Sequence, residues 1–505
     1  MSDIGDSTES DSVLGQDDSE LALSGIRMLL NNGFDEAQAL FDKYKNDSSL
    51  MHAGHSFVYF MTALISFEDE RLAEALKKLE ETEKLCDTDS GILKSFKRKF
   101  KSKKRKEGEV TISIEDRIQR QVIVADSILY QGILVFTNQD IPSYIKGGWY
   151  LRKAYKIYEK LHKEVNQLIG NLKLKKSKSQ NCLSSTGSGV MIDGPIDSND
   201  NELTEDVLSR LLGAVNFGYG TFQLCISMVP PKILKLIEFL GFEGDGVAGL
   251  AALEFTSQSK DMKGPLATLG LLWYHTVLRP FFALDGANDY NAGIEEAETI
   301  IAEKESDFQN SALFLFFRGR IQRLRKKTDE SLELYRQALE AAKGQKELEL
   351  MNLYEIGWCH IMKLNWRESL GAFTRLKDDT KWSKCYYTYL MGVSLGAMGD
   401  VKGAKDTLKD VPGLLKKKNN QIEAFVSRRA EKMKKNPPTQ EYCRLLSLEL
   451  VFLWHALPTC TEEELKPFLD VCDMQTDIKI FHLKCLLEGA IYTELGHEEN
   501  ALQVR

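Results

Sequence analysis

Three stretches share one spacing of small and large residues: GRIQRLRKKTDESLELY (319–335), GWCHIMKLNWRESLGAF (357–373) and GVSLGAMGDVKGAKDTL (392–408). Each begins with glycine, has a small residue twelve positions later and ends on a large residue four positions beyond that. Their glycines lie 38 and then 35 residues apart. Antiparallel helices pack closely where both carry small side chains, and a large side chain one turn later fills the adjoining groove. The spacing therefore predicts helical hairpins repeated at the tetratricopeptide period, about 34 residues.

The same spacing recurs nearer both ends of the chain. Its further members are Gly25 with Ala37 and Phe41, Ala63 with Ala75 and Leu79, and Gly489 with Ala501. In LNNGFDEAQALF (30–41) and GAMGDVKGAKDTL (396–408), glycine marks the break between helices and an acidic residue opens the second one. We therefore predict an all-α, tetratricopeptide-like helical-repeat solenoid with polar inserts, in preference to an irregular α-helical bundle.

The composition favours a helical protein with a large core. Of the 505 residues, 43% are hydrophobic and 11 are proline, which removes a backbone donor and clashes inside a helix. A formal net charge of −8 argues against a chain-wide footprint for nucleic acid. The nine cysteines form no C-x-x-C pair, and the first twenty residues are acidic and serine-rich. We expect a cytoplasmic or nuclear protein with reduced thiols and no signal peptide.

Two stretches without charged residues, 211–231 and 264–278, raise the question of a membrane span. The first contains three glycines, several polar residues and a terminal Pro-Pro pair, and the second is too short to cross a bilayer. We expect buried helices in both places. The alternative is that they line an apolar cavity, as in a lipid- or sterol-handling protein.

Polar segments divide the helical array. In order, the expected segments are a disordered acidic tail (1–19), N-terminal helical repeats (20–89), a basic insert (90–113), a helical repeat (114–176), a disordered loop (177–201), an apolar helical core segment (202–290) and C-terminal tetratricopeptide-like repeats (291–505). The loop is rich in Ser, Asn, Gly and Asp and has no apolar period. The array stops at Arg505 inside the second helix of a repeat, a pattern expected of a truncated product or an alternative isoform.

The stretch GFEGDGVAG (241–249) contains the spacing G-x-G-x-x-G, at Gly244, Gly246 and Gly249, which can mark a nucleotide-binding loop. A Rossmann loop needs a buried strand before it, whereas the preceding PPKILKLIEFL has apolar residues at helical spacing. We therefore expect no nucleotide cofactor here. The stretch is interpreted as a helix C-cap at Gly241, an N-cap at Asp245 and a new helix from Gly246.

A basic run, KSFKRKFKSKKRK (94–106), carries nine Lys or Arg residues interleaved with Phe96 and Phe100. Three interpretations stay open: contact with an anionic membrane, nuclear import or nucleic-acid binding, and a solvated insert. KLKKSK (173–178) could extend the same patch. The candidate patch residues are Lys97, Arg98, Lys99, Lys101, Lys103, Lys104, Arg105 and Lys106.

Signatures of catalysis and metal binding are weak. His52 and His55 in HAGH lack a third ligand nearby, His275 is expected in the core or an interface, and G-x-S-x-G is absent. We expect no catalytic, cofactor-binding or metal site. The aromatic residues should mostly pack between repeats, with a few lining a concave groove; they are Trp358, Trp366, Trp382, Tyr386, Tyr387 and Tyr389. Asn352 and Lys384 lie near the positions of a carboxylate clamp, but the clamp is incomplete.

Longer blocks resemble the tetratricopeptide repeat protein 39 family, which includes the yeast inclusion body clearance protein Iml2. They are YIKGGWYLRKAYKIYEKL (144–161), FGYGTFQLCISMVPPKILKLIEFLGFEGD (217–245), GPLATLGLLWYHTVLRPFFALDG (264–286), LFLFFRGRIQRL (313–324) and LYEIGWC (353–359). The resemblance covers nearly the whole chain from about Leu21 and looks closest to the C member of that family. In two respects the chain departs from its relatives, which usually run further past Arg505 and tend to carry Arg where this chain has Gly246.

The resemblance implies a non-enzymatic repeat protein with no catalytic motif to transfer. Family roles include aggregate clearance linked to lipid droplets, lipid homeostasis through ubiquitin pathways and, for the C branch, cilium formation. We predict an adaptor or scaffold that holds protein partners in a helical groove, with a lipid- or sterol-handling protein as the alternative. Peripheral contact with an anionic membrane, or association with the cilium, is a further expectation. We expect no nucleic acid and no small-molecule substrate as partners.

Overall fold

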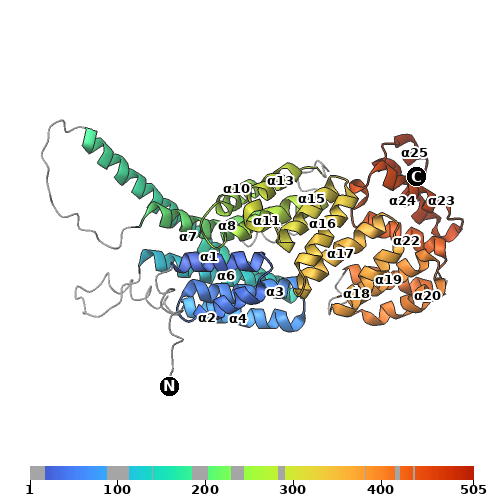
Figure 1. Cartoon of the computed structure of the whole chain (residues 1–505), viewed down its shortest axis with the longest axis horizontal. Helices are drawn as coiled ribbons and strands as arrows, with labels where there is room; N and C mark the ends of the chain where they lie inside the picture. The colour runs from blue at the N-terminus through green and yellow to red at the C-terminus, as the bar shows by residue number, and fades with distance from the viewer. Residues whose placement is uncertain are drawn as a thin grey trace, which may run out of the picture. The chain divides into compact units, whose positions relative to one another are not determined.

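The computed structural model describes residues 17–87, 113–138, 140–184, 203–228, 244–282, 291–380, 383–415, 421–435 and 438–504. These residues form helices joined by short turns, and no strand occurs among them (Figure 1). No helix in the described ranges is long and apolar enough to cross a membrane. The all-α fold predicted from the spacing of small residues is confirmed.

The helices belong to two compact units, which comprise residues 1–29, 33–61 and 72–271, and residues 30–32, 62–71 and 272–505. Helices lying wholly or mainly in the first unit are α1 (Asp18–Leu30), α2 (Phe34–Tyr44), α3 (Ser49–Ser66), α4 (Asp69–Asp87), α6 (Ile114–Phe136), α7 (Ile141–Ser184), α8 (Glu205–Ser227), α10 (Gly246–Ser257) and α11 (Gly264–Trp273). The second unit begins with the π-helical turn η1 (Tyr274–Leu278) and α12 (Arg279–Phe282).

The rest of the second unit is also helical in its described residues. Its helices are α13 (Ile294–Glu303), α14 (Glu305–Phe308), α15 (Ala312–Leu324), α16 (Thr328–Ala341), α17 (Lys346–Met362), α18 (Trp366–Asp379), α19 (Lys384–Met398), α20 (Val401–Asp410), η2 (Val411–Leu414), α21 (Gln421–Lys435), α22 (Gln440–Leu453), η3 (Leu457–Thr459), α23 (Glu462–Asp473), η4 (Ile478–Ile480), α24 (Phe481–Glu494) and α25 (Glu498–Gln503). Helices α15 to α20 pack as consecutive antiparallel neighbours (Figure 1).

The glycines of the repeat spacing lie where two helices of a hairpin cross. A Cβ added to Gly319 would lie 2.6 Å from the ring of Tyr335, and one on Gly392 would lie 2.6 Å from Leu408. Gly357 makes the same approach to Phe373, at 2.8 Å. The large residue sixteen positions after each glycine therefore packs against its backbone, as the spacing predicts.

In the first unit, Phe41 of α2 fills the same kind of crossing twice. Its ring would lie 2.5 Å from a Cβ added to Gly25 of α1 and 2.1 Å from one added to Gly54 of α3. Phe41 itself is fully buried. One aromatic ring thus closes the contact among three helices, and the second of these glycines does not belong to the spacing found in the sequence.

Helices α6, α7 and α8 form the centre of the first unit. Each of the three packs against the other two, and α8 also packs along α10. Their shared apolar contact is formed by Ile118, Val122, Leu161, Val165, Leu211, Ala214 and Val215. Residues 211–227 of the uncharged stretch thus belong to a packed helix, α8.

Two expected boundaries need correction. Helix α1 begins at Asp18, inside the segment expected to be a disordered tail, and α7 continues to Ser184, inside the expected loop. Segments 1–16, 88–112 and 185–202 hold most of the expected tail, basic insert and loop, and they lie outside the described residues.

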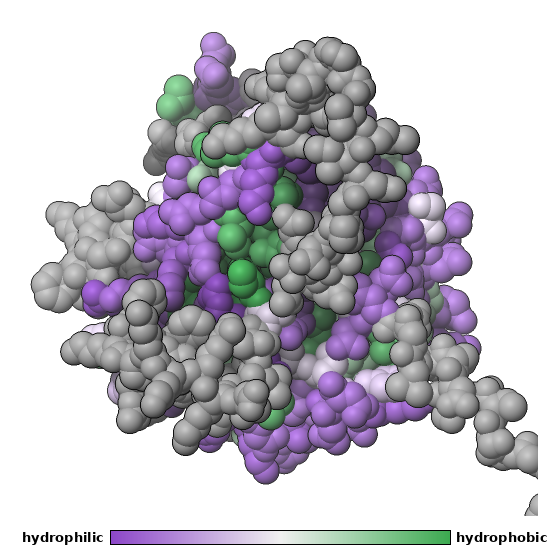
Figure 2. Space-filling view, turned by 90° about the vertical axis from the view of Figure 1, so that its left-hand side faces the viewer, coloured by the Kyte–Doolittle hydropathy of each residue, from purple (hydrophilic) through white to green (hydrophobic). Residues whose placement is uncertain are grey.

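The surface of the described residues is mostly hydrophilic on the face drawn in Figure 2, and a smaller hydrophobic area is exposed between the hydrophilic side chains. Scattered apolar residues on a surface need no explanation, but contiguous ones mark interaction sites.

Candidate functional site

The G-x-G-x-x-G stretch forms a close helix contact. Asp245 caps α10 by accepting a hydrogen bond from the Ala248 amide, 3.0 Å away, as the sequence predicts. A Cβ on Gly249 would lie 2.7 Å from the Leu224 amide nitrogen of α8, and one on Gly244 would lie 2.4 Å from the Ser227 amide nitrogen. The missing side chains let α8 and α10 touch through their backbones, so these two glycines serve packing. Gly241 lies outside the described residues.

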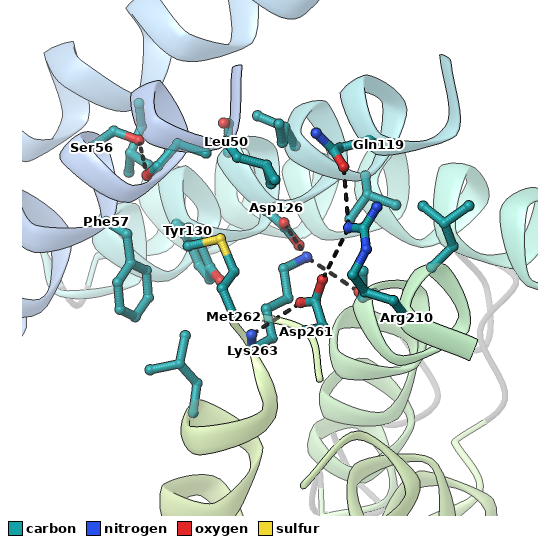
Figure 3. A pocket seen from close by; sticks show the side chains of 18 residues that line it. Leu50, Ser56, Phe57, Gln119, Asp126, Tyr130, Arg210, Asp261, Met262 and Lys263 are labelled. Carbon is teal, nitrogen blue, oxygen red and sulfur yellow. Dashed lines mark hydrogen bonds and ion pairs between the residues drawn. The ribbon is translucent and has the colours of Figure 1, made fainter. Parts of the chain in front are cut away.

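A cluster of buried charges lies in the first unit, where α6 faces the turn between α10 and α11 (Figure 3). Lys263 forms an ion pair with Asp126 of α6, and its ammonium also donates to the Ala214 carbonyl at 3.2 Å. Tyr158 of α7 donates a hydrogen bond to the same Asp126 carboxylate. All three side chains are more than nine-tenths buried; Lys263 connects α6 with α8, and Asp126 connects α6 with α7.

A second ion pair adjoins the first. Arg210 of α8 lies 3.8 Å from the Asp261 carboxylate, donates to Gln119 at 3.2 Å and pairs with Glu115 of α6. Asp261 in turn accepts a hydrogen bond from the Lys263 amide at 3.0 Å. Burial raises the pKa of both the Asp126 and the Asp261 carboxyl, and the charge of Lys263 opposes the rise in each case.

The cavity enclosed by this cluster measures about 40 Å³. That space suits one or two water molecules, whereas sites for drug-sized ligands typically span about 300–1,000 Å³. Apolar residues such as Leu50, Phe57 and Met262 complete its wall (Figure 3). The geometry therefore supports a structural network that fixes helix positions, and it offers no room for a nucleotide or an acyl chain.

The second unit has its own buried charge cluster. Glu355 of α17 pairs with both Arg320, at 3.3 Å, and Arg323 of α15. Arg320 also donates to the Thr276 carbonyl of η1 at 2.9 Å. The three charged side chains are each at least nine-tenths buried. Because buried charges are tolerated when paired and hydrogen-bonded, the cluster joins α15, α17 and η1.

Four of the six candidate aromatic residues lie in the core. Trp358, Tyr386, Tyr387 and Tyr389 are each at most 4% exposed. Trp454, which caps α22, stacks on Trp358 with ring centroids 5.1 Å apart, and α22 packs against α19. These rings are therefore covered by the chain itself, and the expectation that most of the aromatic residues pack inside the repeat array is confirmed for these four. Trp366 is partly buried, and Trp382 lies outside the described residues.

The two candidate clamp residues do not form a clamp. Asn352 is fully buried, and its amide donates to the Leu348 carbonyl of its own helix at 2.9 Å. Lys384 is partly exposed at the start of α19. A buried asparagine cannot reach the carboxylate of a peptide in solvent.

The histidines fit a core role better than a metal site. The rings of His52 and His55 lie 6.3 Å apart, and burial lowers the pKa of His55 to about 4. His275 is 4% exposed, as expected for a core residue, and burial lowers its pKa to about 4. Within the described ranges, no group of three or more His, Cys, Asp and Glu residues is placed to hold a metal ion.

Exposed apolar side chains occur at the end of α23, in η4 and along α24. Ile478 is 87% exposed, and Met474, Phe481 and Leu486 are each about half exposed. We call these four residues the η4 surface. Large apolar side chains are the usual anchors of protein interfaces.

The sequence-based candidate patch lies outside the described residues. Its eight residues fall within 88–112, between the end of α4 and the start of α6. The residues that the structure does bring together, around Lys263 and Glu355, were not found from the sequence. The available signal was a lone acidic residue in an apolar helix, such as Asp126 within VIVADSILY.

Close Gly-to-aromatic crossings, repeated helical hairpins and buried inter-repeat charges define a tetratricopeptide-type helical-repeat protein. The Iml2/Tetratricopeptide repeat protein 39 family model matches residues 23–495, and the chain belongs to that family. The resemblance noted in the sequence is thereby confirmed.

Solved structures similar to this chain over most of its length share little sequence identity with it. The human IFIT1 dimer is 12% identical, with a TM-score of 0.37, over 97% of this chain and 91% of that chain. Yeast Tom70 is 12% identical, with a TM-score of 0.29, over 95% and 96%. Cut9, in the APC/C hetero-tetramer Cut9-Hcn1, is 12% identical, with a TM-score of 0.28, over 98% and 96%.

Proposed function

We propose that this chain is a non-enzymatic scaffold that binds protein partners through exposed apolar side chains of its repeat helices. The observation that carries the proposal is the η4 surface, where Ile478 is 87% exposed beside a well-packed core. Repeat arrays build extended surfaces of this kind, and a few apolar anchors supply most of the affinity of a protein interface. The buried clusters supply rigidity to the scaffold.

Site-specific photo-crosslinking in cells tests this proposal. A photoreactive amino acid at position 478 or 481 should give discrete adducts with other proteins. The matched control is Val247 of α10, which is 81% exposed but lies in the other unit. Adducts at Val247 identical to those at 478 and 481, or no adducts at the η4 surface, would contradict the proposed interface.

A membrane contact by the basic run (94–106) remains part of the proposal. Nine basic residues within thirteen positions suit anionic headgroups, at about 1 kcal/mol for each residue near the surface. If this contact exists, reversing the charges of Lys103, Lys104 and Arg105 should abolish co-sedimentation with anionic vesicles.

The cellular process is proposed from the family alone. Membrane-linked or ciliary assembly suits a scaffold that combines a protein-binding surface with a basic segment. For the alternative, a lipid- or sterol-handling protein, the uncharged helices would need to line a cavity. Instead, α8 and α10 touch through Gly220 and Gly249, and the cavity beside Lys263 measures about 40 Å³. The described residues therefore favour the scaffold.

A further inference from the structure

Helix α7 has two opposite faces over residues 145–165. One face packs against α6 and α8 and is buried at Gly147, Ala154, Tyr158, Leu161 and Val165. At about 100° per residue, the exposed residues Ile145, Trp149, Lys153, Lys156, Lys160 and Lys163 fall within an arc of roughly 80° on the opposite side. We call these six residues the α7 outer face.

The outer face begins with exposed apolar side chains. Trp149 is 61% exposed, Ile145 is 57% exposed, and Tyr144 beside them is 50% exposed. Pro142, Tyr150 and Lys146 complete an open depression of about 890 Å³ around the first two. The guanidinium of Arg152 lies 6.0 Å from the centre of the Trp149 ring, so a cation accompanies the indole.

The outer face continues as a stripe of lysines. Lys153 pairs with Glu83 of α4 at 2.7 Å, and Lys163 pairs with Glu159 at 2.7 Å. In the described part of the chain, Lys156 and Lys160 form no ion pair. The stripe therefore keeps a net positive charge, and its partner must be anionic.

The combination of residue types selects among anionic partners. Protein interfaces are depleted in lysine, which the outer face carries at every turn. Single-stranded nucleic acid needs repeated aromatic stacking platforms, whereas Trp149 is followed by lysines and preceded by isoleucine. A helix that lies on a membrane has this pattern, with Trp and aliphatic side chains entering the interface and lysines contacting lipid phosphates.

We propose that the α7 outer face is a peripheral binding surface for an anionic lipid bilayer. Ile145 and Trp149 enter the interface, and Lys156 and Lys160 contact the phosphate groups of the lipids. Fourteen residues separate Trp149 from Lys163, or about 21 Å along the axis, so α7 lies flat on the bilayer. The α7 outer face shares no residue with the η4 surface or with the basic run, and this proposal does not depend on protein scaffolding.

Co-sedimentation of the full chain with vesicles tests the surface. The probes are phosphatidylcholine vesicles with and without phosphatidylserine. The Lys156→Glu/Lys160→Glu variant should bind the anionic vesicles at least about 25-fold more weakly, because each lysine contributes roughly fivefold. The matched control is Lys405→Glu/Lys409→Glu, an equally spaced exposed pair on α20, which should bind as the original chain does.

A second measurement reports on Trp149 itself. Brominated lipids should quench the fluorescence of the original chain more than that of the Trp149→Phe variant, since the indole enters the interface.

Variants of the outer face that bind anionic vesicles as well as the original chain would overturn the proposal, and so would an original chain that binds none. If only Lys103→Glu/Lys104→Glu/Arg105→Glu loses binding, the basic run is the membrane site and the outer face is not. If the Lys156→Glu/Lys160→Glu variant instead loses binding to a single-stranded RNA probe and keeps its vesicle binding, the outer face is a nucleic-acid site.

Discussion

Lys263 places a positive charge beside two buried carboxylates, Asp126 and Asp261. We expect Lys263→Met to lower the free energy of unfolding by about 3–5 kcal/mol at neutral pH, because removal of one partner leaves buried charge uncompensated. Thermal unfolding of the full chain measures the loss. Lys260→Met is the matched control, since Lys260 is exposed three positions earlier, and it should change stability by less than about 0.5 kcal/mol.

The pH dependence of that loss follows from the same carboxylates. Burial raises their folded-state pKa values, so the folded state holds its protons more tightly than the unfolded state does. Protonation of these two carboxyl groups therefore stabilises the folded state. This stabilisation is complete below the unfolded carboxyl pKa, about 4, and is lost as the pH rises through the folded pKa. The deficit of Lys263→Met should therefore shrink from neutral pH toward about pH 5. A deficit that is equal at both pH values would contradict this assignment. It would also be contradicted if the double variant Asp126→Asn/Lys263→Met were no more stable than Lys263→Met.

Long-range polar pairs of this kind could not be predicted from the sequence. Asp126 and Lys263 lie far apart in the chain, and no local spacing connects them. The cap at Asp245, by contrast, was predictable because its hydrogen bond to Ala248 spans three residues. The same limit applies to Trp358 and Tyr386: packing between repeats was predictable, but their stacking partner, Trp454, comes from a distant helix and could not be identified from the sequence.

At the scale of the helix, the contact between α8 and α10 depends on Gly249. Alanine normally stabilises a helix interior by about 1 kcal/mol relative to glycine. At this position its Cβ would lie 2.7 Å from the Leu224 amide nitrogen and 2.9 Å from the Gly220 carbonyl oxygen. We therefore expect Gly249→Ala to destabilise the protein by about 1–3 kcal/mol, as overpacking does, in chemical denaturation.

Gly270 of α11 supplies the control for that substitution. No atom lies within 4 Å of a Cβ added there, so Gly270→Ala should be neutral or stabilising, by up to about 1 kcal/mol. Equal effects at the two positions would show that helix propensity, and not the close approach of α8 and α10, decides the outcome.

The helical hairpins were predictable because their contacts are local. Gly319 and Tyr335 lie only sixteen residues apart, and the small size of one and the large size of the other can be seen directly in the sequence. The length of α7 was not predictable from apolar periodicity, because the sequence of its last turns, KSKSQNCLS, contains no continuous apolar stripe. The helix nevertheless continues into the expected loop, and the pair of Lys176 with Glu205 of α8 supports its last turns.

At the scale of the whole molecule, the repeat period predicts the fold class but not the division into two units. Neighbouring hairpins share one pattern along the sequence, whereas the units are defined by which distant segments contact one another. Segment 62–71 shows the difficulty, since it groups with residues 272–505 although it lies between two segments of the first unit. Only long-range packing assigns it.

Two units with separate cores should unfold in separate transitions, and buried cysteines can report on each. Cys86 lies in the first unit; the second contains Cys359, Cys385, Cys443, Cys460 and Cys472, all buried. Burial raises the pKa of Cys359, Cys385, Cys443 and Cys472 to about 12, so these thiols are protonated and protected from alkylation until their unit opens.

Iodoacetamide pulses across a urea series, read by mass spectrometry, should label Cys86 at one midpoint and the other five together at another. Lys263→Met should shift only the Cys86 midpoint, because its ion pair lies in the first unit. A single shared midpoint that moves as a whole in this variant would show that the chain unfolds as one cooperative body.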